Sequence, residues 1–551
     1  MTPSPNTDHF DVGVVGLGPT GLVMAHLLAE HGLRVLVLER EPDHYGMARA
    51  VHTDDECLRI LQRAGVADEV HAAMISDLPV RWIRADGKVS GQFHDPSTPL
   101  DWPKANFLYQ PEFEATLEAR LQERDTVTIR RGRAVIGVAQ DGDSVEVTHA
   151  ECAGADYGRS EARLVDGTTE TTRMPYLIAA DGGRSVIRTS LDIAMTGRSF
   201  PQRWLVIDLS ARPGTRPFDH LSEFDFICDA QRPTVSCPQP GNRHRFEFML
   251  HDDDQTAEFE DTEMAVQLLS RHVDAADVVI DRQLAYTFNA LVADRWRVGR
   301  IFLAGDAAHM TPQFIGQGMN AGIRDADNLS WKLADVIHHR LDPSNLETYE
   351  SERRPHAKAM IDLSVFNKDL VSTGNRSLCR LRDVGLPLAS RMPLAGDFIK
   401  EAKMKPRPRF RSGYLGMPRG RQLTRSPEGT LFPQPRVSGT RLDDLLGSGW
   451  AVIGIGVDSR EAIAPEVSAP LTPTLLTLEP AETDADFRRW LARHGLRRGS
   501  IVVLRPDRYV LTATRPGDHG RAAAFLARLC PSSPVSLVSP VLSPVPSGAP
   551  S

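Results

Sequence analysis

Short apolar runs and a helical spacing of apolar residues alternate near the start of the chain. Residues Val12–Val15 form a continuous apolar run, which predicts a buried strand. The pattern over Leu22–Glu30 is helical, and Gly32 is typical of a helix end. A second apolar run at Val35–Leu38 predicts another buried strand. Strand, helix and strand in this order predict a βαβ unit with parallel strands.

Two later apolar runs each end in small residues and an aspartate. One run leads into Asp181 and Gly182, and the run Ile301–Ala304 leads into Gly305 and Asp306. Parallel strands present their carboxyl ends at one edge of a sheet, where α/β proteins bind ligands. We therefore expect both aspartates at the ligand-binding edge of the sheet that contains the βαβ unit.

The middle of the chain, from Asp192 to Arg295, alternates apolar and polar residues. This alternation is typical of antiparallel strands. We expect strands at 203–209, 224–229, 234–240 and 244–250.

The last third predicts a further small domain. Its pattern gives a strand at 450–456, a helix at 484–496, a strand pair at 500–513 and a helix at 520–530. A basic segment at 400–425 precedes it; proline and glycine interrupt this segment, which favours a solvated linker or interdomain surface over a nucleic-acid site. The tail has six prolines, seven serines and no charge, and it predicts disorder.

These patterns divide the chain into five parts. They are an α/β domain at 10–190 and 282–375, an antiparallel-sheet domain at 191–281, a linker at 376–430, a C-terminal domain at 431–530 and a tail at 531–551.

Composition narrows the classes of partner. The net charge of −8 disfavours general binding to nucleic acid or to anionic lipid. No uncharged apolar stretch approaches the roughly 18 residues that span a bilayer, and the polar N-terminus does not resemble a signal peptide. None of the six cysteines forms a C-x-x-C pair, so zinc ligation and dithiol chemistry are not expected. We expect a reduced cytoplasmic protein without a metal, membrane or nucleic-acid partner.

Three glycines, Gly16, Gly18 and Gly21, form a G-x-G-x-x-G motif between the first strand and its helix. The first permits a tight turn, the second lets the backbone approach a pyrophosphate, and the third lets helix and strand pack closely. The helix N-terminus offers N–H groups to phosphate. Glu39 lies 18 residues beyond Gly21, where an acid can accept hydrogen bonds from ribose hydroxyls. The unit therefore predicts dinucleotide binding.

The segment 305–333 places Pro312 and the two glycines Gly316 and Gly318 directly before a long helical pattern. The apolar residues at helical spacing predict a core-facing side, and the charged residues between them are expected on a solvated face. The apolar set is Ile323, Ala326, Leu329, Leu333 and Val336, and the charged set is Asp325, Asp327 and Lys332.

Three segments occur in a characteristic order and spacing: the G-x-G-x-x-G motif, the segment with Asp181 and Gly182, and the segment with Gly305 and Asp306. They resemble those of the FAD-dependent aromatic hydroxylases, flavoprotein monooxygenases with a fold like that of p-hydroxybenzoate hydroxylase. Three further segments, Arg245–Leu250, Arg353–Val365 and Leu504–Ala513, resemble the subgroup that hydroxylates 3-(3-hydroxyphenyl)propionate and 3-hydroxycinnamate. The resemblance covers roughly residues 11–513. It implies an α/β fold with a Rossmann-like FAD-binding domain, an inserted antiparallel-sheet substrate domain and a C-terminal thioredoxin-like domain without C-x-x-C.

The resemblance also implies how FAD would be held. Asp306 would accept from the ribityl hydroxyls, Pro312 would lie beside the reactive face of the ring, and the glycine turn would direct N–H groups at the pyrimidine carbonyl. Arg49 and Gln110 would meet the phosphates or the flavin chain. The implied FAD-binding residues are Gly16, Gly18, Gly21, Glu39, Arg40, Arg49, Gln110, Asp181, Gly305, Asp306, Gly316, Gly318, Met319 and Asn320.

The implied reaction is ortho-hydroxylation of a phenol with O2 and NADH or NADPH, in aromatic catabolism. For 3-(3-hydroxyphenyl)propionate the product would be the 2,3-dihydroxy compound. The substrate carboxylate needs a cation, for which Arg203 and Arg245 are candidates. Catalytic candidates are Pro312 and His309, the latter either deprotonating the phenol or packing locally. The family resemblance also implies a homodimer.

Two alternatives remain open at this point. The first is a hydroxylase of a larger phenol or polyketide on the same scaffold. The second is a flavin-binding protein without oxygenase activity.

Overall fold

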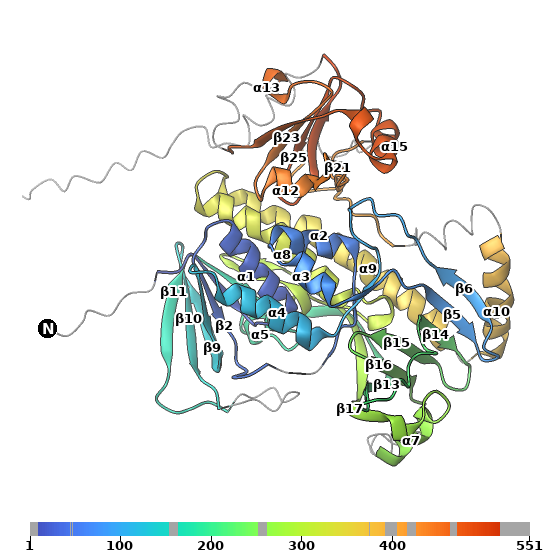
Figure 1. Cartoon of the computed structure of the whole chain (residues 1–551). Coiled ribbons are helices and arrows are strands. Elements are labelled where there is room, and N and C mark those ends of the chain that lie inside the picture. The colour runs from blue at the N-terminus through green and yellow to red at the C-terminus, as the bar shows by residue number, and fades with distance from the viewer. Residues whose placement is uncertain are drawn as a thin grey trace, which may run out of the picture.

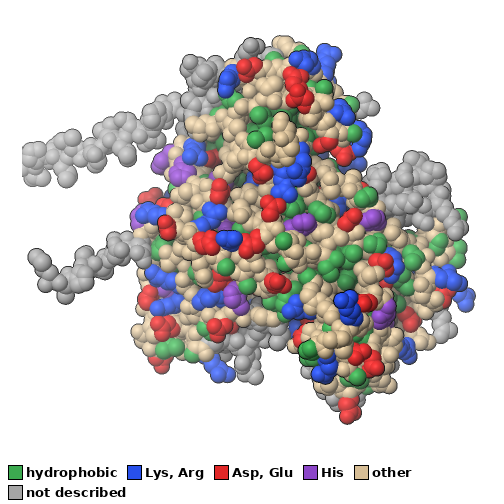
Figure 2. Space-filling view, in the orientation of Figure 1, with side chains coloured by type: hydrophobic (Ala, Val, Ile, Leu, Met, Phe, Trp, Pro, Cys, Tyr) green, Lys and Arg blue, Asp and Glu red, His purple; other side chains and the backbone are tan. Residues whose placement is uncertain are grey.

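The protein combines a parallel sheet, a large antiparallel sheet and a small C-terminal domain, which lies at the top of Figure 1. On the face drawn in Figure 2, basic and acidic side chains are interspersed. The computed structural model describes residues 9–517 except 45, 47, 154–162, 252–261, 374, 392–404, 416–425 and 463–470. Within these ranges, no helix combines the length and apolarity that crossing a bilayer requires.

The predicted βαβ unit is present at the centre of a six-stranded sheet. Both predicted aspartate-bearing strands pair beside it, so the N-terminal strand lies between the second strand of the unit and the strand before Asp181. The sheet is parallel except for its edge strand β18. The order is β18 (Arg297–Val298), β19 (Ile301–Leu303), β12 (Tyr176–Ala179), β1 (Val12–Val15), β2 (Val35–Leu38) and β8 (Val127–Arg130).

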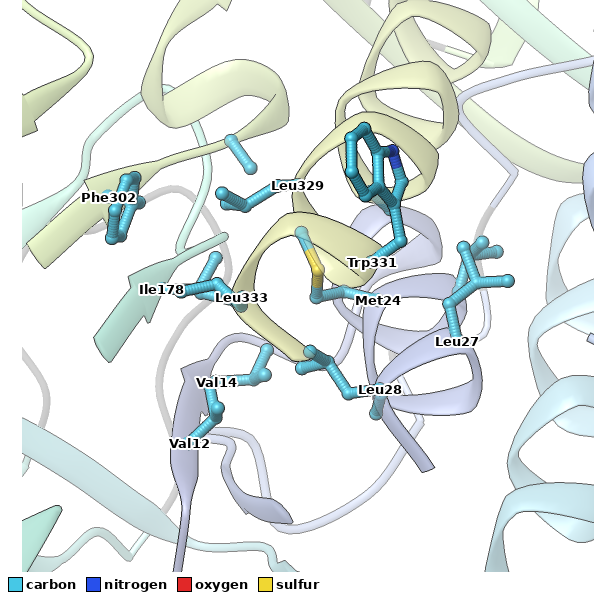
Figure 3. Close-up of a cluster of buried hydrophobic side chains, with 14 of the residues drawn as sticks. Val12, Val14, Met24, Leu27, Leu28, Ile178, Phe302, Leu329, Trp331 and Leu333 are labelled. Carbon is cyan, nitrogen blue, oxygen red and sulfur yellow. The ribbon is translucent and has the colours of Figure 1, made fainter. Parts of the chain in front are cut away.

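Two helices pack over this sheet because their apolar faces are complementary to it. Helix α1 (Pro19–Glu30) is buried from Gly21 to Ala29, and helix α8 (Gly318–Ile337) runs beside it. Figure 3 shows Met24 and Leu28 of α1 in one buried apolar cluster with Leu329 and Leu333 of α8 and with Val14 of the first strand. The predicted core face of α8 is therefore confirmed.

The prediction of a solvated face on α8 is wrong. Asp325, Asp327 and Lys332 are all buried. Local periodicity indicates which residues share a helix face, but it does not show what packs against that face. Here α2 (Asp55–Arg63) and α9 (Thr348–Ser372) pack against α8, and the charges are paired with Arg63 of α2 and with Glu352 and Arg353 of α9.

The antiparallel sheet contains the four strands expected in the middle of the chain. It also includes two strands from residues 80–93, which the alternation pattern did not reveal, because β5 joins β14 in parallel across a long stretch of sequence. The order is β20 (His309–Met310), β17 (Val278–Ala293), β13 (Met195–Ala211), β16 (Arg243–Met249), β15 (Thr234–Gln239), β14 (Phe224–Cys228), β5 (Val80–Arg84) and β6 (Val89–Phe93).

The C-terminal domain has a four-stranded mixed sheet, in which β23 pairs in parallel with β24 and antiparallel with β25. Alternate residues point to opposite faces. Ile453 and Val502 pack against helix α15 (Ala485–His494), whereas Val452 and Val503 join the core of the α/β domain. The predicted helix at 520–530 and the tail lie outside the described residues. The strand order is β24 (Thr474–Leu478), β23 (Ala451–Ile455), β25 (Ser500–Leu504) and β26 (Val510–Thr514).

Smaller elements complete the fold. One small sheet contains β9 (Arg133–Gln140), β10 (Val145–Glu151) and β11 (Glu170–Met174). Another contains β3 (His52–Thr53), β7 (Asn106–Phe107) and β4 (Ile75–Ser76). A two-stranded ladder joins β21 (Arg436–Val437) and β22 (Thr440–Arg441). Other helices are α2 (Asp55–Arg63), α3 (Ala67–Ala72), α4 (Gln110–Gln122), α5 (Val186–Ser190), α7 (Thr262–Leu269), α9 (Thr348–Ser372), α10 (Arg376–Arg391), α12 (Leu442–Leu446) and α13 (Ser459–Ala462).

Candidate active site

The glycine motif forms the turn between β1 and α1. Gly16 has φ +99°, and a Cβ there would lie 2.4 Å from the Ala180 carbonyl oxygen. A Cβ on Gly21 would lie 1.9 Å from the carbonyl oxygen of Gly16, so glycine is required for this close packing. A Cβ on Gly18 would meet nothing within 4 Å. The space in front of Gly18 is therefore open, as a bound pyrophosphate requires.

Glu39 is held at the end of β2 by backbone amides. Its Oε2 accepts from the Leu17 amide at 2.6 Å, and its Oε1 accepts from the Glu41 amide at 2.9 Å. Arg40 pairs with Glu41 instead of pointing its charge at Glu39. The carboxylate is thus fixed beside the glycine turn, and each oxygen keeps a lone pair for a ribose hydroxyl.

Gln110, at the start of α4, acts on the backbone of a neighbouring loop. Its Oε1 accepts from the amide of Arg49 at 2.8 Å and from the amide of Ala50, and its Nε2 donates to Glu114 at 2.7 Å. The Arg49 side chain is exposed and lines the large cavity described below. Gln110 therefore positions the loop that carries Arg49.

The two aspartates at the strand ends differ in surroundings. Asp181 Oδ2 accepts from the Ile187 amide at 3.4 Å, while its Oδ1 is buried without a hydrogen-bond partner among the described residues. Asp306 follows β19 in the short turn Gly305–Ala307, and its side chain is exposed. Gly305 has φ +60°, and a Cβ there would lie 2.6 Å from the Thr20 hydroxyl. Both carboxylates thus have the capacity to accept hydrogen bonds from a ligand.

The turn before α8 is held by the side chain of Asn320. Its Nδ2 donates to the Gly316 carbonyl at 2.7 Å, and its Oδ1 accepts from the Thr53 hydroxyl at 2.9 Å. Gly316 has φ +59°, and its Cβ would lie 3.0 Å from the His52 ring. Gly318 and Met319 open α8, and the carbonyl of Pro312 accepts from Ser364. The turn is therefore rigid, and its residues 313–317 line the cavity.

A cavity of about 920 Å³ extends from this turn to the C-terminal domain. One wall is apolar and comes from the antiparallel sheet, with Trp82, Phe224, Phe226 and Val235. The opposite end is lined by the linker segment 405–409 and by α15. The cavity therefore joins the turn before α8, the antiparallel sheet and the C-terminal domain.

Glu247 is a titratable group on the cavity wall that sequence reasoning missed. It lies on β16, is buried, and accepts a hydrogen bond from Gln313, which in turn accepts from the Tyr286 hydroxyl. Burial raises the pKa of Glu247 to about 7, although the charge of Arg245 opposes the shift. The available signal was a single acid between two phenylalanines, Phe246 and Phe248.

The predicted substrate arginines have different surroundings. Arg245 is buried on the cavity wall; its Nε donates to Asp208 at 2.6 Å and its Nη1 to the Arg49 carbonyl at 2.7 Å. Arg203 lies on β13, pairs with Thr287 of β17 in the sheet, and is not among the residues that line the cavity. Arg245 is thus the one of the two beside the cavity, with most of its charge met by Asp208.

His309 is fully buried, and it does not belong to the cavity lining. Its Nε2 pairs with Asp325 Oδ2 at 2.7 Å, and its ring stacks on Trp296 with centroids 5.1 Å apart. Asp325 also accepts from Arg353 at 2.8 Å. These contacts favour the local packing role over phenol deprotonation.

The residues present fit FAD. The open space at Gly18, the fixed carboxylate of Glu39, the unpartnered oxygen of Asp181 and the exposed Asp306 follow one edge of the parallel sheet. No side chain caps the N-terminus of α1, which leaves that helix end to a phosphate. Among the described residues, no three His, Cys, Asp or Glu side chains group as metal ligands.

Comparison with known proteins agrees with this geometry. Residues 9–364 match the family described as "FAD binding domain", and residues 429–529 match the "HcaD C-terminal domain". The chain is 34% identical to a 3-(3-hydroxy-phenyl)propionate/3-hydroxycinnamic acid hydroxylase of Burkholderia cenocepacia, over 95% of this chain and 97% of the relative. The hydroxylase of the same name from Mycobacterium avium is 35% identical, over 93% of this chain and 91% of the relative.

Solved structures with the same fold include aklavinone-11 hydroxylase bound to FAD and aklavinone. It has a TM-score of 0.76 and 25% identity, over 95% of this chain and 99% of that one. The flavin-dependent monooxygenase PieE also has a TM-score of 0.76, with 21% identity, over 96% of this chain and 100% of that one. The chain therefore belongs to the family of FAD-dependent aromatic monooxygenases that includes the 3-(3-hydroxyphenyl)propionate/3-hydroxycinnamic acid hydroxylases.

Proposed function

We propose that the protein hydroxylates 3-(3-hydroxyphenyl)propionate or 3-hydroxycinnamate ortho to the phenol hydroxyl, giving the 2,3-dihydroxy product. The reaction consumes O2 and NADH or NADPH, and it releases water and the oxidised nicotinamide. The relatives with these names support the substrate class. The observation that carries the proposal is a single cavity that joins the glycine turn before α8, an apolar wall and the buried acid Glu247.

FAD, when bound, supplies the oxygen-transfer chemistry. The chain would hold it through Glu39, Asp181 and Asp306, with Arg49 beside it. The rigid turn at Gly316 would direct N–H groups towards the ring, where they stabilise negative charge.

The protein's own acid–base step is assigned to Glu247. Its carboxylate accepts the proton of the substrate phenol, which makes the ring carbon ortho to the oxygen more electron-rich. Gln313 holds the carboxylate in place, and Tyr286 holds Gln313. The apolar wall excludes water from the ring.

The test is to follow NADH and NADPH oxidation by the FAD-loaded protein with and without 3-(3-hydroxyphenyl)propionate. We expect oxidation stimulated by the acid and coupled to the 2,3-dihydroxy product. Stimulated oxidation that yields peroxide alone would show that the natural phenol is a different one. Absence of bound FAD after reconstitution would contradict the proposal as a whole.

The cavity volume favours a second candidate, a larger phenol such as a polyketide. A volume of about 920 Å³ is near the upper end of the roughly 300–1,000 Å³ typical of ligand sites, although bound FAD would occupy part of it. The same assay with a polycyclic phenol distinguishes the two. Tighter coupling of oxidation to product with the polycyclic phenol than with the phenylpropionate would favour the larger substrate.

A further inference from the structure

The end of the cavity opposite the glycine turn carries three arginines from outside the FAD-binding domain. Arg407 and Arg409 lie in the linker segment 405–415, and Arg493 lies on α15 of the C-terminal domain. All three line the cavity. We call this group, Arg407, Arg409 and Arg493, the arginine rim.

Four other basic side chains of the cavity are paired with nearby acids. Lys405 pairs with Asp54 at 2.9 Å, and Arg245 pairs with Asp208 at 2.6 Å. In the same way Lys104 pairs with Asp95 and Arg489 with Asp486.

The acids on the cavity wall leave little negative charge to oppose the rim. Asp54 and Glu56 are paired with Arg324 as well as with Lys405. Burial raises the pKa of Asp55 to about 7, as it does for Glu247, so neither carries a full charge at neutral pH.

The rim itself is a cluster of like charges. Burial lowers the pKa of Arg493, and the charge of Arg407 lowers it further. Among the described residues, no carboxylate oxygen lies within 4 Å of the Arg407 or Arg493 guanidinium. Arg409 donates to the Ser426 carbonyl at 3.1 Å, which fixes its direction. Like charges held together at a concave surface attract an anion, because the anion removes their mutual repulsion.

We propose that the arginine rim binds the carboxylate of the substrate, so that the C-terminal domain takes part directly in substrate selection. This inference rests on the proposed function. The rim ends a cavity whose wall is apolar and whose other end carries the glycine turn, an arrangement that fits a ligand with one anionic end and an apolar body. Trp490 of α15 lines the same end and adds apolar surface beside the charges.

The test uses the full-length FAD-loaded protein with Arg407→Ala and Arg493→Ala combined. For 3-(3-hydroxyphenyl)propionate we expect kcat/KM about tenfold lower, the loss of roughly one charge-assisted hydrogen bond. For 3-ethylphenol, which lacks the carboxylate, we expect kcat/KM to stay roughly unchanged. Raised salt should lower kcat/KM of the wild type for the acid more than that of the double variant.

Arg488→Ala is the matched control, because Arg488 lies on the same helix but does not line the cavity. An equal loss for the acid and for 3-ethylphenol would overturn the proposal and assign the rim to cavity shape. A raised KM for NADH or NADPH with an unchanged KM for the acid would also overturn it and assign the rim to the nicotinamide diphosphate.

Failure of the proposed function can be told apart from failure of the rim. If the wild type hydroxylates neither phenol, binding of the acid and of 3-ethylphenol is measured by perturbation of the flavin absorbance. Weaker binding of the acid alone in the double variant would support the rim. Equal binding of the acid by the wild type and the variant would overturn it.

Discussion

Glu247 is the side chain that we expect to set the pH dependence of hydroxylation. Its pKa is raised to about 7, so the carboxylate that accepts the phenol proton is present above that pH and disappears below it. The value of kcat/KM should therefore rise through pH 7. In Glu247→Gln the limb near pH 7 should be lost and kcat should fall about 100-fold or more. A variant that keeps the same limb would show that another group takes the proton.

Substitutions at Gly18 and Gly21 distinguish a role in folding from a role in cofactor binding. A Cβ on Gly21 would lie 1.9 Å from the Gly16 carbonyl oxygen, so Gly21→Ala should lower the melting temperature even without FAD. A Cβ on Gly18 would meet nothing within 4 Å, so Gly18→Ala should melt like the wild type and bind FAD at least about tenfold more weakly. Thermal melts of the FAD-free proteins and FAD titrations measure both effects. Unchanged FAD affinity in Gly18→Ala would mean that the pyrophosphate lies elsewhere.

At the scale of the element, α8 is joined to the end of β19 through Asp325. This carboxylate accepts from the Gly305 amide at 3.1 Å and from Arg353 at 2.8 Å. Although burial opposes ionisation, His309 and Arg353 hold the pKa of Asp325 below its usual value.

Asp325→Asn leaves the buried Arg353 without its charge partner. We expect the free energy of unfolding to fall by about 3–5 kcal/mol, measured by urea denaturation. The pH profile of the remaining activity should keep its limb near pH 7, because neither Asp325 nor His309 lines the cavity. Loss of that limb would instead place His309 in the proton transfer.

At the scale of the whole molecule, buried ion pairs join the FAD-binding domain to the C-terminal domain. Glu352 of α9 accepts from Arg505 at 2.8 Å and from Lys332 at 2.8 Å, and Arg59 of α2 donates to Asp443 at 2.8 Å. Although burial opposes ionisation, Arg505 and Lys332 lower the pKa of Glu352 to about 2.

A carboxyl whose pKa is lowered by folding stabilises the protein above its unfolded pKa, here about 4.5, and the stabilisation is lost as the pH falls towards 2. Glu352→Gln should therefore cost about 3–5 kcal/mol at pH 7 and flatten the acid dependence of the melting temperature over that range. Asp362→Asn is the control: its pair with Lys358 is exposed and should be worth less than about 1 kcal/mol. Equal losses in both variants would contradict the assignment of stability to the buried network.

Several features were determined by the sequence itself. Local apolar patterns predict the buried strands at 12–15 and 35–38 and the helix between them. The glycine spacing predicts the tight turn, because Gly16 has a positive φ and Gly21 leaves no room for a Cβ. The four middle strands were also predictable, because the alternation of apolar and polar residues can be recognised in each strand without knowledge of its partner strands.

Other features were decided by the tertiary structure. The pairing of β5 with β14 joins residues far apart in sequence, and no local pattern encodes such a register. Asp327 and Lys332 are buried because α2 and α9 supply Arg63 and Glu352 as partners, which a helical period cannot reveal. Glu247 meets Gln313 for the same reason: an antiparallel strand and a loop after β20 converge at one cavity. Local physics sets which faces are apolar, and packing between distant segments sets which polar groups share an enclosed site.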